Sequence, residues 1–191
     1  MPQSSLFQAA LFRSKTLSDI RSFFLKRNVL EVESPLLSQG ASHDFHIDLF
    51  TVSDGKSTRF LQTSPEPHMK RLLARGYPDI YQISKAFRMG ESGRKHNPEF
   101  TMLEFYQAYA DYKDLMTFTE HLLRYLCDTV IGTQQVEYQG ATIDFSKPFA
   151  RMSVKEALLK HHESLTPQQL ESVESCRAFL ESLSLPYKAS D

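Results

Sequence analysis

One acidic side chain in the middle of the sequence, Glu104, has neighbours that could give it a chemical role. It belongs to a stretch rich in strand-forming residues, 100–109, which favours a β-strand. Side chains alternate between the two faces of a strand, so Glu104 shares a face with the aromatic residues Phe100 and Tyr106. An unpaired carboxylate among rings is costly. The pattern therefore predicts that Glu104 faces a cation.

Arg88 is one candidate for that cation. It ends a predicted strand and is joined to Phe100 by a polar loop, residues 89–98, so the two strands should form an antiparallel pair. Arg88 and Glu104 would then share a sheet face. Arginine grips phosphate oxygens through two N–H groups, and a nearby ring can stack on a planar base, which suits a nucleotide. The alternative is a structural salt bridge between Arg88 and Glu104, with solvated charges in the loop.

Three stretches carry a resemblance to a known family. Residues 87–106 resemble the second signature motif of class II aminoacyl-tRNA synthetases, in the form of the lysyl branch. Residues 31–35 look like the first motif, which that family uses for dimerisation, and residues 63–73 match the helix between the motifs. The resemblance implies an α+β fold with an antiparallel sheet flanked by helices. It also implies a homodimeric ligase that uses ATP and Mg²⁺.

The resemblance assigns the nucleotide to four residues of the second motif. Arg88 would be the catalytic residue, because it would hold both the α-phosphate of ATP and the carboxylate of the substrate. His96 and Asn97 would contact the nucleotide, and Phe100 would stack on adenine.

A lysine-like substrate would occupy the acidic part of the same site. Glu66, Glu104 and Tyr106 would surround its amino groups, with Arg88 on its carboxylate. The ligand itself would then be the cation that Glu104 requires. Taken alone, Glu66 has a simpler explanation, because an acidic residue in the first turn of a helix is favourable.

Two features depart from the family pattern. Gly90 stands where the family usually has a glutamate, two residues after the arginine. The third motif, a glycine-rich stretch ending in an arginine, and the metal-binding acidic residue that accompanies it are not found within residues 1–191. We therefore expect a truncated catalytic domain over 1–191, with no metal ligands in this chain, no anticodon-binding domain and no useful rate of adenylate formation by itself.

Shorter stretches of the sequence bear on which molecule accepts the activated amino acid. Residues 64–71 and 93–94 resemble the elongation factor P lysine ligases, which attach (R)-β-lysine to a lysine of elongation factor P. Residues 108–115 and 143–149 look closer to lysyl-tRNA synthetases. The similarity to the elongation factor P ligases is favoured here. It implies activation of lysine or (R)-β-lysine as an adenylate and transfer to elongation factor P. The alternatives are a fragment that charges tRNA-Lys and a non-catalytic remnant that binds nucleotide or another chain.

Composition sets broader limits. The 191 residues have a formal net charge of −1 and 41% hydrophobic residues, enough for one sizeable core and without a global basic field for nucleic acid. Two cysteines, no signal-like N-terminus and no apolar run of membrane-spanning length favour a cytoplasmic protein without membrane contact.

The residues above must be positioned by elements that local patterns predict. Ser64, Pro65 and Gly76 mark the beginning and end of one helix, and Asp111 and Gly132 mark those of another. Capping-box patterns at Ser153 and Thr166 predict two further helices. The other predicted elements are a helix at 6–28, strands at 29–32, 45–50, 80–83, 86–88 and 100–109, and hairpins at 53–62 and 136–145.

Overall fold

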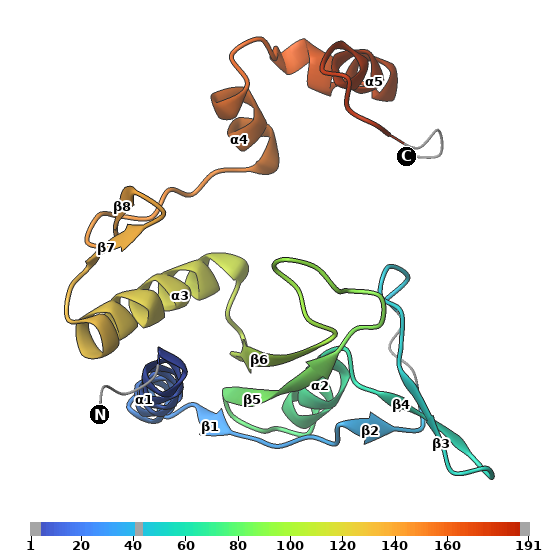
Figure 1. Ribbon diagram of the computed structural model, residues 1–191, viewed down its shortest axis with the longest axis vertical. Helices are drawn as coiled ribbons and strands as arrows, with labels where there is room; N and C mark the ends of the chain where they lie inside the picture. Colours follow the sequence, from blue (N-terminus) through green and yellow to red (C-terminus); the bar gives the residue numbers. More distant parts are fainter. Residues whose placement is uncertain (1–4, 41–43, 188–191) are drawn as a thin grey trace. The chain divides into compact units, whose positions relative to one another are not determined.

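The computed structural model describes residues 5–40 and 44–187, which form two compact units dividing after Ser146 (Figure 1). Among the described residues, the first unit holds three sheets and three α-helices, and the second unit holds two α-helices. The fold is α+β with antiparallel strand pairs, as predicted. A single catalytic domain over 1–191 stays a prediction.

The main sheet has the strand order β1-β5-β6. The two long strands, β5 (Ile80–Phe87) and β6 (Glu99–Tyr106), are antiparallel, and the short β1 (Leu30–Glu31) runs parallel to β5. Gln82 lies opposite Glu104 in the β5–β6 register. The predicted strand pair is confirmed, but β6 ends at Tyr106 instead of Tyr109. Tyr109 has a φ of 62°, a left-handed conformation that a strand cannot contain.

A smaller sheet is formed by β2 (Leu37–Ser38), β4 (Thr58–Leu61) and β3 (Thr51–Ser53), in that order. The predicted hairpin is confirmed, and Asp54 Oδ1 accepts N–H bonds from the tight turn that connects its strands. The predicted strand at 45–50 is wrong. Asp44 Oδ1 accepts the backbone N–H of His46 and starts a turn there, and Phe45 is 99% exposed.

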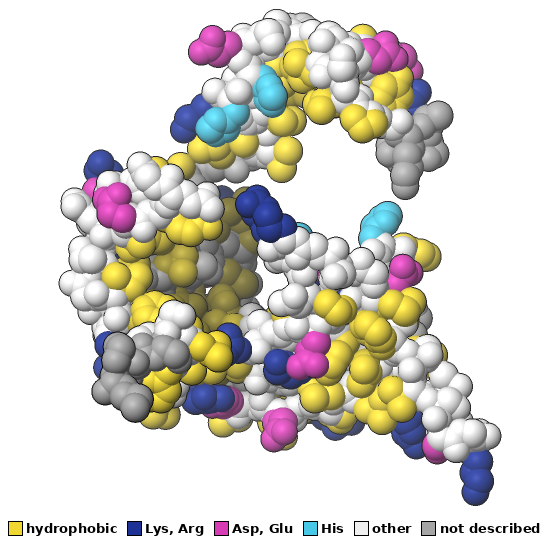
Figure 2. Space-filling model, in the orientation of Figure 1, with side chains coloured by type: hydrophobic (Ala, Val, Ile, Leu, Met, Phe, Trp, Pro, Cys, Tyr) yellow, Lys and Arg dark blue, Asp and Glu magenta, His cyan; other side chains and the backbone are white. Residues whose placement is uncertain are grey.

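Two helices, α1 (Ser5–Leu25) and α3 (Tyr112–Leu126), build the core with the main sheet. Phe24 is fully buried and stacks on Tyr81 of β5, with 4.2 Å between ring centroids. Figure 2 shows hydrophobic side chains gathered between these two helices. The prediction of α3 is confirmed by a capping box at Asp111, and a π-helical segment, Cys127–Ile131, extends it to Gly132.

The helix α2 (Glu66–Ala74) packs on β6 through the buried Met69 and carries residues of the candidate site. Pro65 takes the N-cap position predicted for Ser64, although Ser64 Oγ still accepts the N–H of Glu66. Gly76 follows the helix with a φ of 85°, a left-handed conformation that ends it.

The remaining elements follow α3. The hairpin of β7 (Gln135–Tyr138) and β8 (Ala141–Asp144) closes the first unit and is confirmed. In the second unit, Ser153 caps α4 (Val154–His161) as predicted. The capping box at Thr166 begins only a short 3₁₀ helix, Pro167–Leu170, and α5 (Val173–Ser182) begins after Ser172 instead. Among the described helices, none has the length and apolar character to cross a membrane.

Candidate active site

A cavity of about 770 Å³ opens beside β6 and the N-terminal half of α2. It brings together Glu66, Arg88, Glu104 and Tyr106, four of the residues that the sequence selects. The β5–β6 register explains this for Arg88, Glu104 and Tyr106, whose even positions share one sheet face, whereas Glu66 comes from α2. The other lining residues are Asp44, Ile47, Thr63, Ser64, Pro67, Lys70, Met102 and Phe105.

Glu104 is held from two sides by hydroxyl groups. Ser64 Oγ donates to Glu104 Oε2 at 2.8 Å, and the Tyr106 hydroxyl donates to Glu104 Oε1 at 2.5 Å. Within the described residues, no lysine or arginine forms an ion pair with this carboxylate. The predicted protein cation is therefore not found, and the carboxylate is oriented toward a cavity that can admit a cationic ligand.

Tyr106 is a stable hydrogen-bond donor in this arrangement. Burial raises the pKa of its phenol, and the bond to Glu104 and the negative charge of Glu66 raise that pKa further. The hydroxyl therefore keeps its proton at neutral pH and continues to orient Glu104.

Arg88 extends the antiparallel pairing beyond β5, because its backbone N–H donates to Pro98 O at 2.8 Å. Its guanidinium carbon lies 5.3 Å from the centre of the Phe100 ring, within cation–π range. Its Nη1 lies 4.0 Å from Glu91 Oε1, the outer limit of an ion pair. The alternative of an Arg88–Glu104 salt bridge is wrong for this structure, and Arg88 faces the cavity beside a planar ring.

The remaining charges make the cavity acidic. Glu66 pairs with Lys70 one helical turn away, at 2.5 Å, and about half of each side chain is exposed. Such a pair contributes little to stability, so Glu66 can exchange Lys70 for a ligand ammonium. The lining holds three carboxylates, of Asp44, Glu66 and Glu104, against two cations, and this excess favours a positively charged ligand.

His96 and Asn97 do not line this cavity. Both are exposed on the loop between β5 and β6, where Gly93 and His96 exchange backbone hydrogen bonds. Gly90, at the start of this loop, has a φ of 79°, which a glutamate at the same place would adopt only with strain. The proposed contacts of His96 and Asn97 with the nucleotide stay predictions, as does the stacking of adenine on Phe100.

Two residues of the site go unrecognised in the sequence. Ser64 is predicted only as a helix cap, yet its hydroxyl also orients Glu104. Lys70 carries no signal except its spacing of four residues from Glu66. Only the fold brings Ser64 to Glu104, 40 positions away in the sequence.

The residues fit ATP better than they fit a metal ion. Arg88 beside Phe100 offers a cation for phosphate and a ring for a base. Over the residues that the structure describes, no cluster of three or more His, Cys, Asp or Glu side chains could hold a metal ion.

Residues 2–179 match the family of class II tRNA synthetases (D, K and N), and the chain belongs to this family. This confirms the family resemblance seen in the sequence.

The most similar relatives include three bacterial lysine–tRNA ligases. That of Legionella pneumophila is 48% identical over 190 residues, which cover 95% of this chain and 37% of the relative. Those of Thioalkalivibrio sulfidiphilus and Coxiella burnetii are 40% and 39% identical, over 93% and 90% of this chain. The chain spans little more than a third of the length of these relatives. Their names favour the tRNA synthetase alternative over the elongation factor P ligase that the sequence ranks first.

Proposed function

We propose that this chain contributes the amino-acid side of a site that activates lysine with ATP, as in a lysine–tRNA ligase. The observation that carries the proposal is the pair Glu104 and Arg88 in one cavity. Glu104 has both oxygens oriented by hydroxyl groups and has no described protein cation. A lysine molecule supplies two ammonium groups for Glu104 and Glu66 and a carboxylate for Arg88.

The reaction proposed for this site is formation of an aminoacyl-adenylate. A carboxylate oxygen of lysine attacks the α-phosphorus of ATP, a new P–O bond forms, and the bond to the β-phosphate oxygen breaks with release of pyrophosphate. Arg88 holds the reacting carboxylate near the phosphate and stabilises the negative charge of the transition state. Glu104 and Glu66 orient the amino groups away from the reacting centre.

For the acceptor, we propose tRNA-Lys, because the relatives named above are lysine–tRNA ligases. Elongation factor P is the rival acceptor. Fluorescence anisotropy of the labelled chain with either tRNA-Lys or elongation factor P compares them directly. We expect the tRNA to bind more tightly at low salt, and tighter binding of elongation factor P would reverse the assignment.

The substrate is tested by binding, which does not require turnover. We expect lysine to bind the purified chain more tightly than norleucine, which has the same carbon skeleton without the ε-ammonium group. Isothermal titration measures both affinities. Arg88→Gln should weaken both ligands, since both have a carboxylate. Equal affinities of lysine and norleucine for the unaltered chain would overturn the proposal.

A further inference from the structure

A second cavity adjoins the candidate lysine site and has a different charge. It encloses about 390 Å³ between β2, β4 and α2. Its described lining includes the basic residues Arg59, His68 and Arg71 and contains no aspartate or glutamate. Thr63 and Ser64 line both cavities, so a ligand here would lie close to the residues that orient Glu104.

The three basic side chains have no partner within the part of the chain that the structure describes. No hydrogen bond or ion pair joins the side chain of Arg59, His68 or Arg71 to another described residue. Lys70, next to Arg71 in the sequence, is by contrast paired with Glu66. Uncompensated basic groups around one hollow create a local field that favours an anion.

Gln62 lines the cavity and has a buried oxygen that accepts no hydrogen bond from the described residues. Gln62 is 7% exposed, and its Nε2 donates to Lys85 O at 2.8 Å. Its Oε1 is buried without a hydrogen bond to any described residue. A buried acceptor left unpaired is unfavourable. A protonated phosphate oxygen, or a sugar hydroxyl beside the phosphates, would supply the missing donor to Gln62 Oε1.

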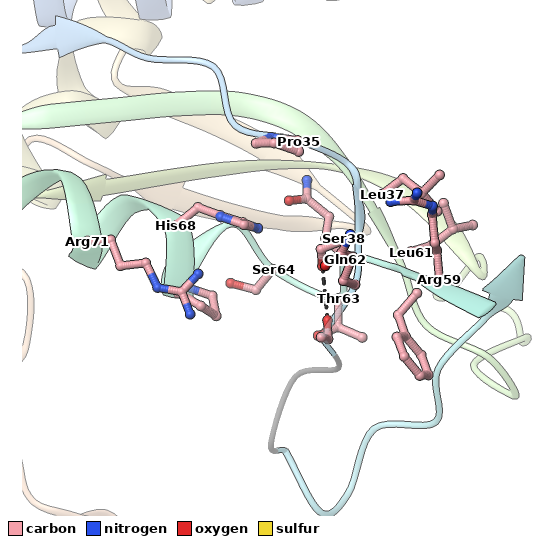
Figure 3. A pocket seen from close by; sticks show the side chains of 14 residues that line it. Pro35, Leu37, Ser38, Arg59, Leu61, Gln62, Thr63, Ser64, His68 and Arg71 are labelled. Atoms are coloured by element: carbon pink, nitrogen blue, oxygen red, sulfur yellow. Dashed lines mark hydrogen bonds between the residues drawn. The ribbon is translucent and has the colours of Figure 1, made fainter. Parts of the chain in front are cut away.

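The basic groups are separated across the cavity (Figure 3). His68 and Arg71 project from α2 on one side, and Arg59 lies on the other side, with Gln62 between them. One small anion cannot contact both sides as well as an extended ligand can. Arginine favours phosphate oxygens because its planar fork makes two parallel hydrogen bonds with them.

We propose that this cavity binds a ligand with two neighbouring phosphate groups. Free polyphosphate and consecutive phosphates of a nucleic-acid strand share this chemistry. The inference concerns a site beside the lysine site and does not depend on lysine activation. Its proximity to Ser64 provides a route by which an occupied phosphate site could affect Glu104.

Pyrophosphate is the probe for this site. Titration into the full chain, followed by ¹H–¹⁵N spectra at constant ionic strength, should shift the amides of Gln62, His68 and Arg71. Arg59→Gln and Arg71→Gln should each weaken binding roughly tenfold, the loss expected for one charge-assisted contact. Arg75→Gln is the matched control, since Arg75 directly follows α2 and does not line the cavity.

A third variant separates the two sites. Arg88→Gln should leave the pyrophosphate shifts of His68 and Arg71 in place. If Arg88→Gln abolishes those shifts, or if Arg59→Gln and Arg71→Gln leave the affinity unchanged, the inference is wrong. If the chain binds pyrophosphate but does not prefer lysine to norleucine, the proposed function is wrong and the phosphate site is unaffected. A short single-stranded RNA that displaces pyrophosphate would identify a nucleic-acid strand as the source, and failure to displace it would identify free polyphosphate.

Discussion

Glu104 shows how hydrogen bonds can orient a carboxylate before it binds a cation. Two hydroxyl groups, of Ser64 and Tyr106, satisfy one lone pair on each of its oxygens and fix its direction. Hydroxyl donors stabilise the charged carboxylate without neutralising it, so its attraction for an ammonium group is retained. The burial of Tyr106, which keeps its phenol protonated, is part of the same arrangement.

Replacement of the Glu104 carboxylate should weaken lysine binding. Glu104→Gln keeps the shape of the side chain but removes its charge, so lysine binding should weaken by about 2 kcal/mol, the loss typical of a charge-assisted contact. Isothermal titration with lysine measures the change.

Glu99→Gln is the matched control for that experiment. Glu99 lies on the same strand and pairs with Lys85 at 2.9 Å, and it does not line the cavity. Lysine affinity should be unchanged in this variant. A similar loss in both variants, or no loss in Glu104→Gln, would contradict the role of Glu104.

At the scale of elements, the predictions that were confirmed depend on local chemistry. Asp111 and Ser153 cap helices where the sequence predicts, because a cap is completed within one turn. The β5–β6 pair follows from the alternation of residues around Glu104. These local signals were enough to predict that Arg88 and Glu104 share a sheet face, and the family resemblance was needed to predict a common site.

The predictions that failed depend on contacts that a local pattern does not contain. The apolar alternation at 45–50 has the form of a strand, yet in this stretch the chain forms a turn and only Asp48 pairs, with Met89. A strand requires a neighbour along its whole length, and among the described residues only Asp48 and Phe50 of this stretch form backbone hydrogen bonds with other segments. The role of Ser64 was missed for the same reason, since its partner comes from a distant strand.

The packing of α1 on the main sheet gives the element-scale prediction. Phe24 has no exposed surface and contacts the rings of Tyr81, Phe105 and Phe118. Phe24→Ala should destabilise the first unit by about 3–5 kcal/mol, because it leaves a cavity in the core. Hydrogen exchange of the β5 amides measures this loss. Leu25→Ala is the control, with Leu25 76% exposed, and an equal effect in both variants would contradict this account of the core.

Several apolar side chains of α1 are exposed in the described structure. Leu11 and Phe12 are 48% and 54% exposed, and Leu6 is 79% exposed. Exposed apolar residues on one helix are typical of an interface. The homodimer that the family resemblance implies would use such a surface.

Light scattering after size exclusion tests the dimer. We expect the unaltered chain to have the mass of two copies, and the double change Leu11→Lys and Phe12→Lys to give the mass of one. The matched control is the double change Tyr138→Lys and Ile143→Lys on the β7–β8 hairpin, where both side chains are exposed, and it should leave the mass unchanged. A single-copy mass for the unaltered chain would contradict the prediction.

Arg88, Phe100, Glu104 and Tyr106 are proposed to form one site for lysine and ATP. A crystal structure of the chain with a non-hydrolysable lysyl-adenylate analogue tests it most directly. The predicted result places an ammonium group of the analogue within hydrogen-bond distance of Glu104, its phosphate on Arg88 and its adenine on the Phe100 ring. An analogue bound outside the cavity of Glu104 and Arg88, or with its ammonium groups turned away from Glu104, would contradict the claim.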